Sequence, residues 1–153
     1  MPRFRRTRQG CTVRYVRLPR LLSEELVMAR ADGSYGTLMQ TCAKNDLLIL
    51  DDWGLSALGD RDRRDLLELV EDRAGRRATL VTSQLPIEHW HDNIGDATCG
   101  DAILNRLVHH AHRITLSGGS LRRLPTTDAA ITQDDEPHPV HSAHAVIGID
   151  RHR

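Results

Sequence analysis

The sequence lacks any apolar run long enough to cross a bilayer, and no apolar segment typical of a signal peptide follows its arginine-rich start. It also has few cysteines. Cys11, Cys42 and Cys99 are far apart and show no C-x-x-C spacing, which argues against a disulfide framework and against a zinc knuckle. We therefore expect a soluble protein of the cytoplasm without a membrane partner.

A net charge is missing as well, because 21 Lys and Arg residues balance 21 Asp and Glu residues. No overall field favours nucleic acid or a membrane surface. The charge is nevertheless uneven, and residues 1–11 form a basic leader that contains Arg3, Arg5, Arg6 and Arg8. Such a leader either contacts DNA phosphates or is a solvated terminus, and the sequence leaves both interpretations open.

Segments with strand and helix patterns alternate along the first 124 residues. Runs of β-branched and apolar residues predict strands, and apolar residues at helical spacing predict helices between them. The expected strands are residues 12–18, 47–50, 78–82 and 113–116, and the expected helices are residues 19–30, 35–43, 60–74 and 98–111. This alternation predicts an α/β fold in which helices cover both faces of a parallel sheet.

The character of the sequence changes after residue 124. Residues 125–153 contain three prolines, four histidines and an acidic triplet, with little periodic apolar pattern. That composition predicts a disordered or low-order tail. We therefore expect one core domain, residues 12–124, between the basic leader and the tail.

The segment LLILDDWG, residues 47–54, places two adjacent carboxylates, Asp51 and Asp52, at the end of an apolar strand. In open parallel sheets, ligands bind beyond the carboxyl ends of the strands. Four apolar residues followed by an aspartate form a Walker B arrangement, in which the aspartate holds Mg²⁺, usually through water, beside the phosphates of a nucleotide. The alternative, that both aspartates cap the following turn, stays open on this motif alone.

Four blocks of the sequence together resemble one protein family. They are LLILDDWG at 47–54, TLVTSQLP at 79–86, AILNRLVHHAHRI at 102–114 and SLRR at 120–123. In this order and spacing they resemble the IstB-like ATP-binding proteins, AAA+ helpers of insertion-sequence transposases that are related to the DnaC helicase loader. The resemblance covers about residues 12–123 and implies an AAA+ (P-loop NTPase-type) parallel sheet with flanking helices.

The resemblance implies roles around a bound nucleotide for residues at two strand ends. Asp51 would be the Mg²⁺-side aspartate, acting through water, and Asp52 the acid that orients the attacking water. Ser83 and Gln84 fall at the sensor I position, which touches the γ-phosphate or the water. A metal ion and fixed hydrogen-bond donors at these positions stabilise the negative charge on the transferred phosphoryl group. Without the resemblance, Ser83 and Gln84 are equally explained as partners of backbone groups at a strand end.

Three arginines complete the implied site. Arg106, in LNRL, resembles an arginine finger that reaches the nucleotide of a neighbouring subunit, so activity would depend on a homo-oligomer. Arg122 or Arg123 lies where a sensor II arginine is expected. The alternatives are that Arg106 is an ordinary cation on a helix surface and that Arg122 and Arg123 belong to a solvated face.

The sequence has a single lysine, Lys44, and it stands in the segment AKND. A P-loop needs G-x-x-x-x-G-K-[ST], whose amides and lysine hold the phosphates, and the 153 residues contain none. Family members carry that loop before the strand that resembles residues 12–18, so the chain looks like the family without its first strand, P-loop and first helix. We expect the isolated chain to bind ATP and Mg²⁺ without useful affinity, because each missing charge-assisted hydrogen bond is worth about 1.5–3 kcal/mol.

The resemblance also places the strand before the P-loop at the centre of the sheet, between residues 78–82 and residues 113–116. Without that strand, two unpaired strand edges would face each other in the core, which is costly. We therefore expect a marginal or partner-dependent fold.

Three functions stay open on the sequence. The first is an ATP-binding helper of transposition that acts on DNA with a transposase and oligomerises to place Arg106 in trans. The second is a degenerate fragment without activity. The third is an interaction module that keeps DNA or transposase contacts without hydrolysis. The resemblance favours the first, and the absence of a P-loop motif favours the second.

Overall fold

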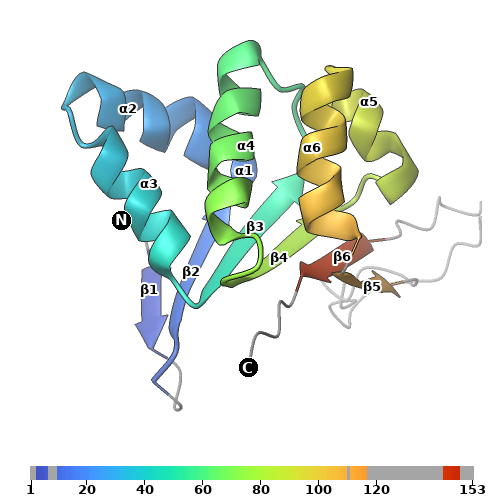
Figure 1. Ribbon diagram of the computed structural model, residues 1–153, viewed down its shortest axis with the longest axis horizontal. Coiled ribbons are helices and arrows are strands. Elements are labelled where there is room, and N and C mark those ends of the chain that lie inside the picture. The colour runs from blue at the N-terminus through green and yellow to red at the C-terminus, as the bar shows by residue number, and fades with distance from the viewer. Residues whose placement is uncertain (1–2, 7–9, 110, 117–142, 149–153) are drawn as a thin grey trace, which may run out of the picture.

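The computed structural model describes residues 3–6, 10–109, 111–116 and 143–148, with side chains for residues 10–109 and 111–116. Six strands form one sheet in the order β1-β2-β3-β4-β6-β5 (Figure 1). They are β1 (Arg3–Arg6), β2 (Thr12–Arg17), β3 (Leu47–Trp53), β4 (Ala78–Ser83), β5 (Ala111–Leu116) and β6 (Ala143–Gly148). Because β2, β3 and β4 are parallel and helices connect them, the expected α/β fold class is confirmed.

The helices lie in the connections between the strands. Between β2 and β3, a continuous helical stretch contains α1 (Leu18–Arg20), a π-helical turn (Leu21–Glu25) and α2 (Leu26–Ala31), and α3 (Tyr35–Lys44) follows. α4 (Asp60–Arg73) connects β3 to β4. A 3-10 turn (Ile87–His89), α5 (Trp90–Ile94) and α6 (Ala97–Val108) lead from β4 to β5. The expected helices are present, whereas the turn and α5 had no counterpart in the sequence pattern.

Two helices have polar side chains that bind backbone N–H groups at their amino ends. The carboxylate of Asp96 accepts a hydrogen bond from the backbone N–H of Cys99 at 2.7 Å, so Asp96 caps α6. α4 is preceded by Gly59, whose backbone N–H donates to the Asp62 carboxylate at 3.0 Å. Each cap lies just before the first helical turn, where backbone N–H groups lack intrahelical partners.

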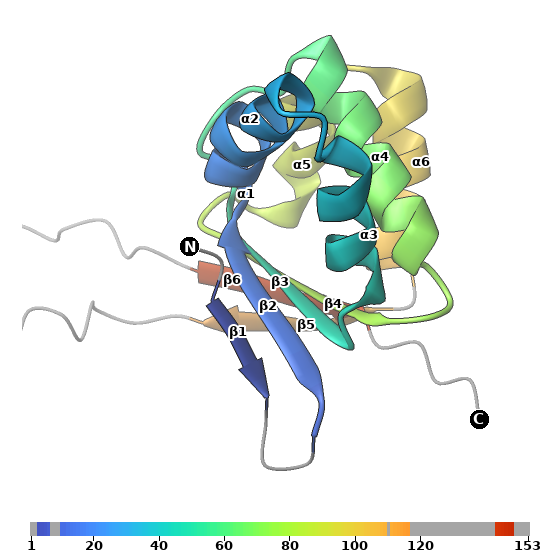
Figure 2. The same cartoon turned by 90° about the vertical axis from the view of Figure 1, so that its left-hand side faces the viewer.

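All helices of the described residues pack on one face of the sheet (Figures 1 and 2). The strand order explains this, because β2, β3 and β4 follow one another in one direction, and right-handed crossovers then place every connecting helix on the same side. Leu48 and Leu50 are fully buried beneath the helices, whereas the alternate residues Leu47 and Ile49 are only partly buried. For this part of the chain, the expectation that helices cover both faces was wrong.

β6 occupies the position that was expected to be empty. It pairs antiparallel with β4, from Thr79 opposite Gly148 to Ser83 opposite His144, and antiparallel with β5 on its other side. The expectation of two facing unpaired edges was therefore wrong. Part of the segment expected to be low order thus forms a strand, and its other residues lie outside the described ones. The basic leader likewise contributes β1, which pairs antiparallel with β2.

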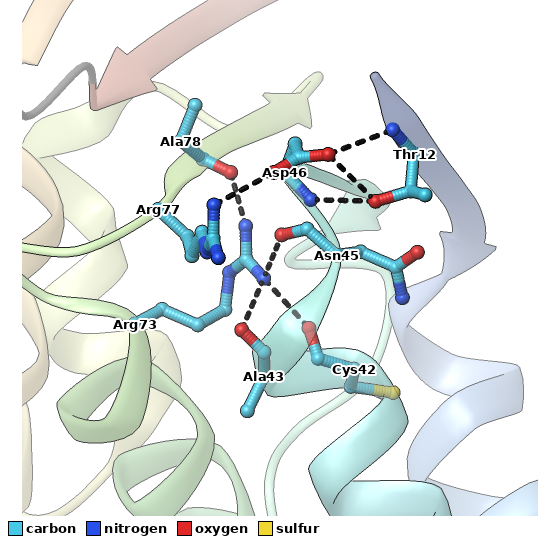
Figure 3. A network of polar contacts seen from close by, with 8 residues as sticks. All are labelled: Thr12, Cys42, Ala43, Asn45, Asp46, Arg73, Arg77 and Ala78. Atoms are coloured by element: carbon cyan, nitrogen blue, oxygen red, sulfur yellow. Dashed lines mark hydrogen bonds and ion pairs between the residues drawn. The ribbon is translucent and has the colours of Figure 1, made fainter. Parts of the chain in front are cut away.

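Arg73, at the end of α4, joins the end of α3 to the amino ends of two strands (Figure 3). Arg73 is 1% exposed, and its guanidinium donates to the carbonyl oxygens of Cys42 (2.6 Å), Ala43 (3.1 Å), Asn45 (2.9 Å) and Ala78. The last carbonyl groups of a helix lack intrahelical donors, and Arg73 donates to two of these groups in α3, those of Cys42 and Ala43. Burial lowers the pKa of Arg73 to about 10, which leaves the side chain charged at neutral pH.

Two tryptophans anchor the carboxyl end of β3 to the helical layer. The rings of Trp53 and Trp90 stack with centroids 4.8 Å apart and an interplanar angle of 27°. Both side chains are buried, and the indole N–H of Trp90 donates to the carbonyl oxygen of Leu85 at 2.9 Å. Both tryptophans therefore belong to the core beneath the helices.

Candidate functional site

A β-bulge at the end of β3 sets the direction of Asp51 and Asp52. Leu50 is the last residue in regular register with β4, and Trp53 then pairs with Ser83, so β3 carries one extra residue. Asp52 has a φ of 63°, in the left-handed region that aspartate adopts more readily than most residues. The bulge returns Trp53 to the buried face while both carboxylates contact side chains on the uncovered face.

The Asp51 carboxylate is held by three donors. It accepts hydrogen bonds from the hydroxyls of Tyr15 in β2 and Thr82 in β4, and from the backbone N–H of Asp52 at 3.0 Å. Burial by itself raises the pKa of this carboxyl, but the hydrogen bonds from Thr82, Tyr15 and the amide outweigh it, so the pKa of Asp51 is lowered. Asp51 is therefore a fixed negative charge at neutral pH.

Tyr15 responds to the same contact in the opposite direction. Its hydrogen bond to Asp51 raises the pKa of the Tyr15 phenol, helped by burial and by the two nearby carboxylates. The hydroxyl therefore stays protonated and donates to Asp51 at neutral pH.

Asp52 is held by a cation. Its carboxylate accepts a hydrogen bond from Nε of Arg17, the last residue of β2, and the two form an ion pair. Arg17 is largely exposed, at 58%, whereas the Asp52 side chain is 22% exposed. The site thus combines two half-buried carboxylates with an exposed cation at the carboxyl ends of parallel strands.

Ser83 and Gln84 do not join this cluster. Ser83 is buried on the helix-covered face, where its Oγ donates to the carbonyl oxygen of Trp53 at 2.7 Å and accepts from the backbone N–H of Leu85 at 2.9 Å. Gln84 is exposed in the turn that follows. In this arrangement Ser83 forms hydrogen bonds with backbone groups at the strand end, which is the alternative that the sequence analysis left open for this residue.

Of the three predicted arginines, Arg106 is the one among the described residues, and it lies apart from the carboxylates. Arg106, on α6, donates to the carbonyl oxygen of Ala102 at 2.8 Å and forms an ion pair with Glu71 of α4 at 2.8 Å. Both contacts are within the helical layer, whereas Asp51 bonds to side chains of the uncovered face. Arg122 and Arg123 lie outside the described residues.

Three side chains of the site were not predicted: Tyr15, Arg17 and Thr82. Tyr15 and Arg17 alternate with buried residues of β2, and Arg17 lies in register with Asp51. Thr82 is one residue before the predicted Ser83 and therefore points to the other face. Period-two alternation along TVRYVR and ATLVTS was the available signal, but it becomes informative only once the strand order is known.

The carboxylates suit Mg²⁺, while the described residues offer no cradle for phosphates. Mg²⁺ is usually held by one or two carboxylates together with waters and substrate phosphates, and Asp51 and Asp52 supply hard oxygen atoms of this kind. Among the described residues, no group of three or more His, Cys, Asp or Glu side chains is gathered as a metal site. Lys44 ends α3, at the amino end of β3 and thus opposite the carboxylates, and its Nζ lies 3.4 Å from the Gln40 side-chain oxygen.

The part of the chain that the structure describes contains no helix with the length and apolar character needed to cross a membrane.

Comparison with known proteins gives one consistent result. Residues 4–129 match the family model described as IstB-like ATP binding protein. An insertion sequence ATP-binding protein of Sinorhizobium fredii, y4pL, is 57% identical over 116 residues, which is 76% of this chain and 47% of the relative. A second one from that organism, y4uH, is 50% identical over 117 residues, with 76% and 47% covered. An ATP-binding protein from a Mycobacterium tuberculosis insertion sequence is 32% identical over 117 residues, with 75% and 46% covered. The chain thus spans about half the length of these relatives.

Proposed function

Because the chain belongs to the IstB-like ATP-binding protein family, we propose that it acts as an ATP-binding helper of insertion-sequence transposition, working on DNA together with a transposase. The observation that carries this proposal is the placement of Asp51 and Asp52 at the carboxyl end of β3, beside Thr82 of the next parallel strand. Carboxylates in this place are what nucleotide-binding sheets use for the metal and the attacking water.

In the proposed site, Asp51 would hold Mg²⁺ through water, and Asp52 would orient the water that attacks the γ-phosphate. Bound Mg²⁺ would supply the positive charge that stabilises the transferred phosphoryl group. Tyr15 and Thr82 fix the Asp51 carboxylate and favour its ionised form. One oxygen of the Asp52 carboxylate contacts Arg17, and the other oxygen would accept the hydrogen bond from the water.

The other proposed residues need a change of partner or another subunit. Arg106 acts as the finger in a homo-oligomer only after it leaves Glu71, to which it is paired in the single chain. Gln84 is exposed and free to turn toward a γ-phosphate, whereas Ser83 would have to give up its backbone contacts. Arg122 and Arg123 keep the proposed sensor II role.

We further propose that this 153-residue polypeptide by itself binds Mg²⁺-ATP with a dissociation constant of about 1–10 mM. Its sequence contains no G-x-x-x-x-G-K-[ST], and its single lysine lies at the opposite end of the sheet. Several phosphate-facing hydrogen bonds of about 1.5–3 kcal/mol each are therefore absent from the site. Tighter binding would require a phosphate-binding segment from outside these residues.

An NMR titration of the full chain tests both proposals separately. As Mg²⁺-ATP is raised to about 10 mM, the amide signals of Asp51 and Asp52 should shift, and they should not shift with ATP and a chelator. Asp51→Ala should abolish the response, while the exposed Asp92→Ala should keep it. No shift at the highest concentration would overturn the nucleotide site. Saturation at micromolar concentration would overturn only the proposed weakness of binding.

A second candidate function is an interaction module that contacts DNA or a transposase without hydrolysis. The observation that favours it is the engagement of both carboxylates by the chain's own donors, Tyr15, Thr82 and Arg17. Fluorescence anisotropy with a labelled DNA duplex distinguishes the two. An interaction module should bind DNA equally well with and without Mg²⁺-ATP and equally well as Asp51→Ala.

A further inference from the structure

β6 is inserted between two strands that do not touch each other. It pairs on one side with β4, with Leu80 opposite Ile147, and on the other side with β5, with His112 opposite Ile147. The sheet order places β5 at the edge, so its only neighbour among the described strands is β6. One short segment near the end of the chain therefore closes two backbone ladders at once.

The position that β6 fills is defined by backbone rather than by a particular side chain. β4 presents an edge opposite its partner β3, and β5 presents the edge that faces β4 (Figure 1). Unpaired backbone N–H and C=O groups on two such edges are a template for any extended segment of the right length. β6 runs antiparallel to both, while β2, β3 and β4 run parallel to one another.

β5 has little else to hold it in the sheet. Five of its side chains, from His112 to Leu116, are exposed, including Ile114 at 45% and Leu116 at 58%. A strand with so little burial depends on backbone pairing for its place. Removal of β6 would therefore release β5 and expose the outer edge of β4 together.

We propose that the gap between β4 and β5 is a strand-binding site, which the chain fills with its own residues 143–148, and which accepts an identical segment in trans when its own is removed. The proposal does not depend on nucleotide binding, because the carboxylates lie on β3. It also implies that a strand from any other polypeptide can enter this position only by displacing β6.

A proline in β6 of the full chain empties the site. Val146→Pro removes a backbone donor from a strand that is paired on both sides, whereas Val146→Thr keeps the donor and the branched shape. A labelled peptide with the sequence of residues 141–150 should bind Val146→Pro at least tenfold more tightly than it binds the wild-type chain or Val146→Thr, and a scrambled peptide should not bind. Equal peptide binding to wild type and to a folded Val146→Pro, or none to either, would overturn the proposal.

Cross-linking in an otherwise unchanged full chain keeps the proposal testable even where Val146→Pro does not fold. Leu80→Cys with Ile147→Cys places two thiols opposite each other, and Leu80→Cys with Ala145→Cys offsets them by two residues. Opposite residues have Cβ atoms about 4.5–5.5 Å apart and can form a disulfide with a small adjustment, whereas diagonal ones at about 7–8 Å cannot. Peptide mapping by mass spectrometry after mild oxidation should find the first link and not the second. The reverse result, or equal yields, would overturn the placement of β6.

Discussion

The hydroxyl of Thr82 in β4 donates a hydrogen bond to the carboxylate of Asp51 in β3. Both residues lie at the carboxyl ends of neighbouring parallel strands, where ligands of such sheets bind. The contact makes Asp51 part of the sheet's own hydrogen bonding. Any group that binds Asp51 must therefore share the carboxylate with the Thr82 hydroxyl or displace that hydroxyl.

Thr82→Val removes that hydroxyl and keeps the branched shape of the side chain. The pKa of Asp51 should rise relative to wild type, because fewer hydrogen bonds then oppose the effect of burial. The free energy of unfolding at pH 7 should fall by about 1 kcal/mol. NMR titration of the Asp51 carboxyl and urea unfolding measure the two effects. Thr41→Val is the control, since its exposed hydroxyl bonds only to the Thr37 carbonyl; an unchanged Asp51 pKa in Thr82→Val would contradict the assignment.

The lowered pKa of Asp51 also sets the sign of its pH dependence. A carboxyl whose pKa is lower in the folded than in the unfolded state stabilises the protein above the unfolded value, and this contribution is lost as pH falls through the folded value. Wild type should therefore be more stable than Asp51→Asn at pH 7, and the difference should shrink below about pH 4. Urea unfolding of both proteins at several pH values measures it. A difference that grows toward acid pH would refute the sign.

The backbone of Asp52 lies in the left-handed region, with a φ of 63°. β-branched residues avoid this conformation, whereas asparagine and glycine adopt it more readily. Asp52→Asn and Asp52→Val both lose the carboxylate charge that pairs with Arg17, so the effect of that charge cancels in their difference. We expect Asp52→Val to be less stable than Asp52→Asn by about 1–2 kcal/mol in urea unfolding. Equal stability would mean that the bulge relaxes to another conformation.

The carboxylates of the site could be predicted from the sequence because their position follows from a local pattern. Four apolar residues before Asp51 predict a buried strand, and a strand's end in a parallel sheet is where ligands bind. The partners of Asp51 could not be predicted in the same way. Tyr15 and Thr82 reach it only through the order and register of three strands, which no local pattern specifies.

β6 shows the same limit at the level of the fold. The segment AHAVIG follows a proline-rich and acidic stretch. The segment itself is short, and its apolar residues show only a weak strand pattern. Its partners Leu80 and His112 are distant in sequence, so the pairing depends on edges that exist only after the sheet has formed. The single-sided helical layer, by contrast, follows from strand order and crossover handedness once that order is known.

Arg73 should be a stability determinant, although it is far from the carboxylates. Arg73→Met removes donors from several buried carbonyl oxygens, and each unsatisfied group costs about 1–3 kcal/mol, so we expect a loss of at least about 3 kcal/mol. Arg73→Lys should recover only part, because an ammonium cannot reproduce the planar fork. Urea unfolding measures the changes. Arg76→Met is the matched control on an exposed arginine and should change stability by less than about 0.5 kcal/mol.

Arg106 and Glu71 form a partly exposed ion pair between α6 and α4, with side chains 34% and 47% exposed. Such pairs contribute little, so a double-mutant cycle with Arg106→Ala and Glu71→Ala should give a coupling energy below about 1 kcal/mol in urea unfolding. Arg106 is then free, at small energetic cost, to change partner in an assembly. A coupling energy above about 2 kcal/mol would instead make Arg106 a structural residue of the helical layer, and the proposed role in trans would lose its physical basis.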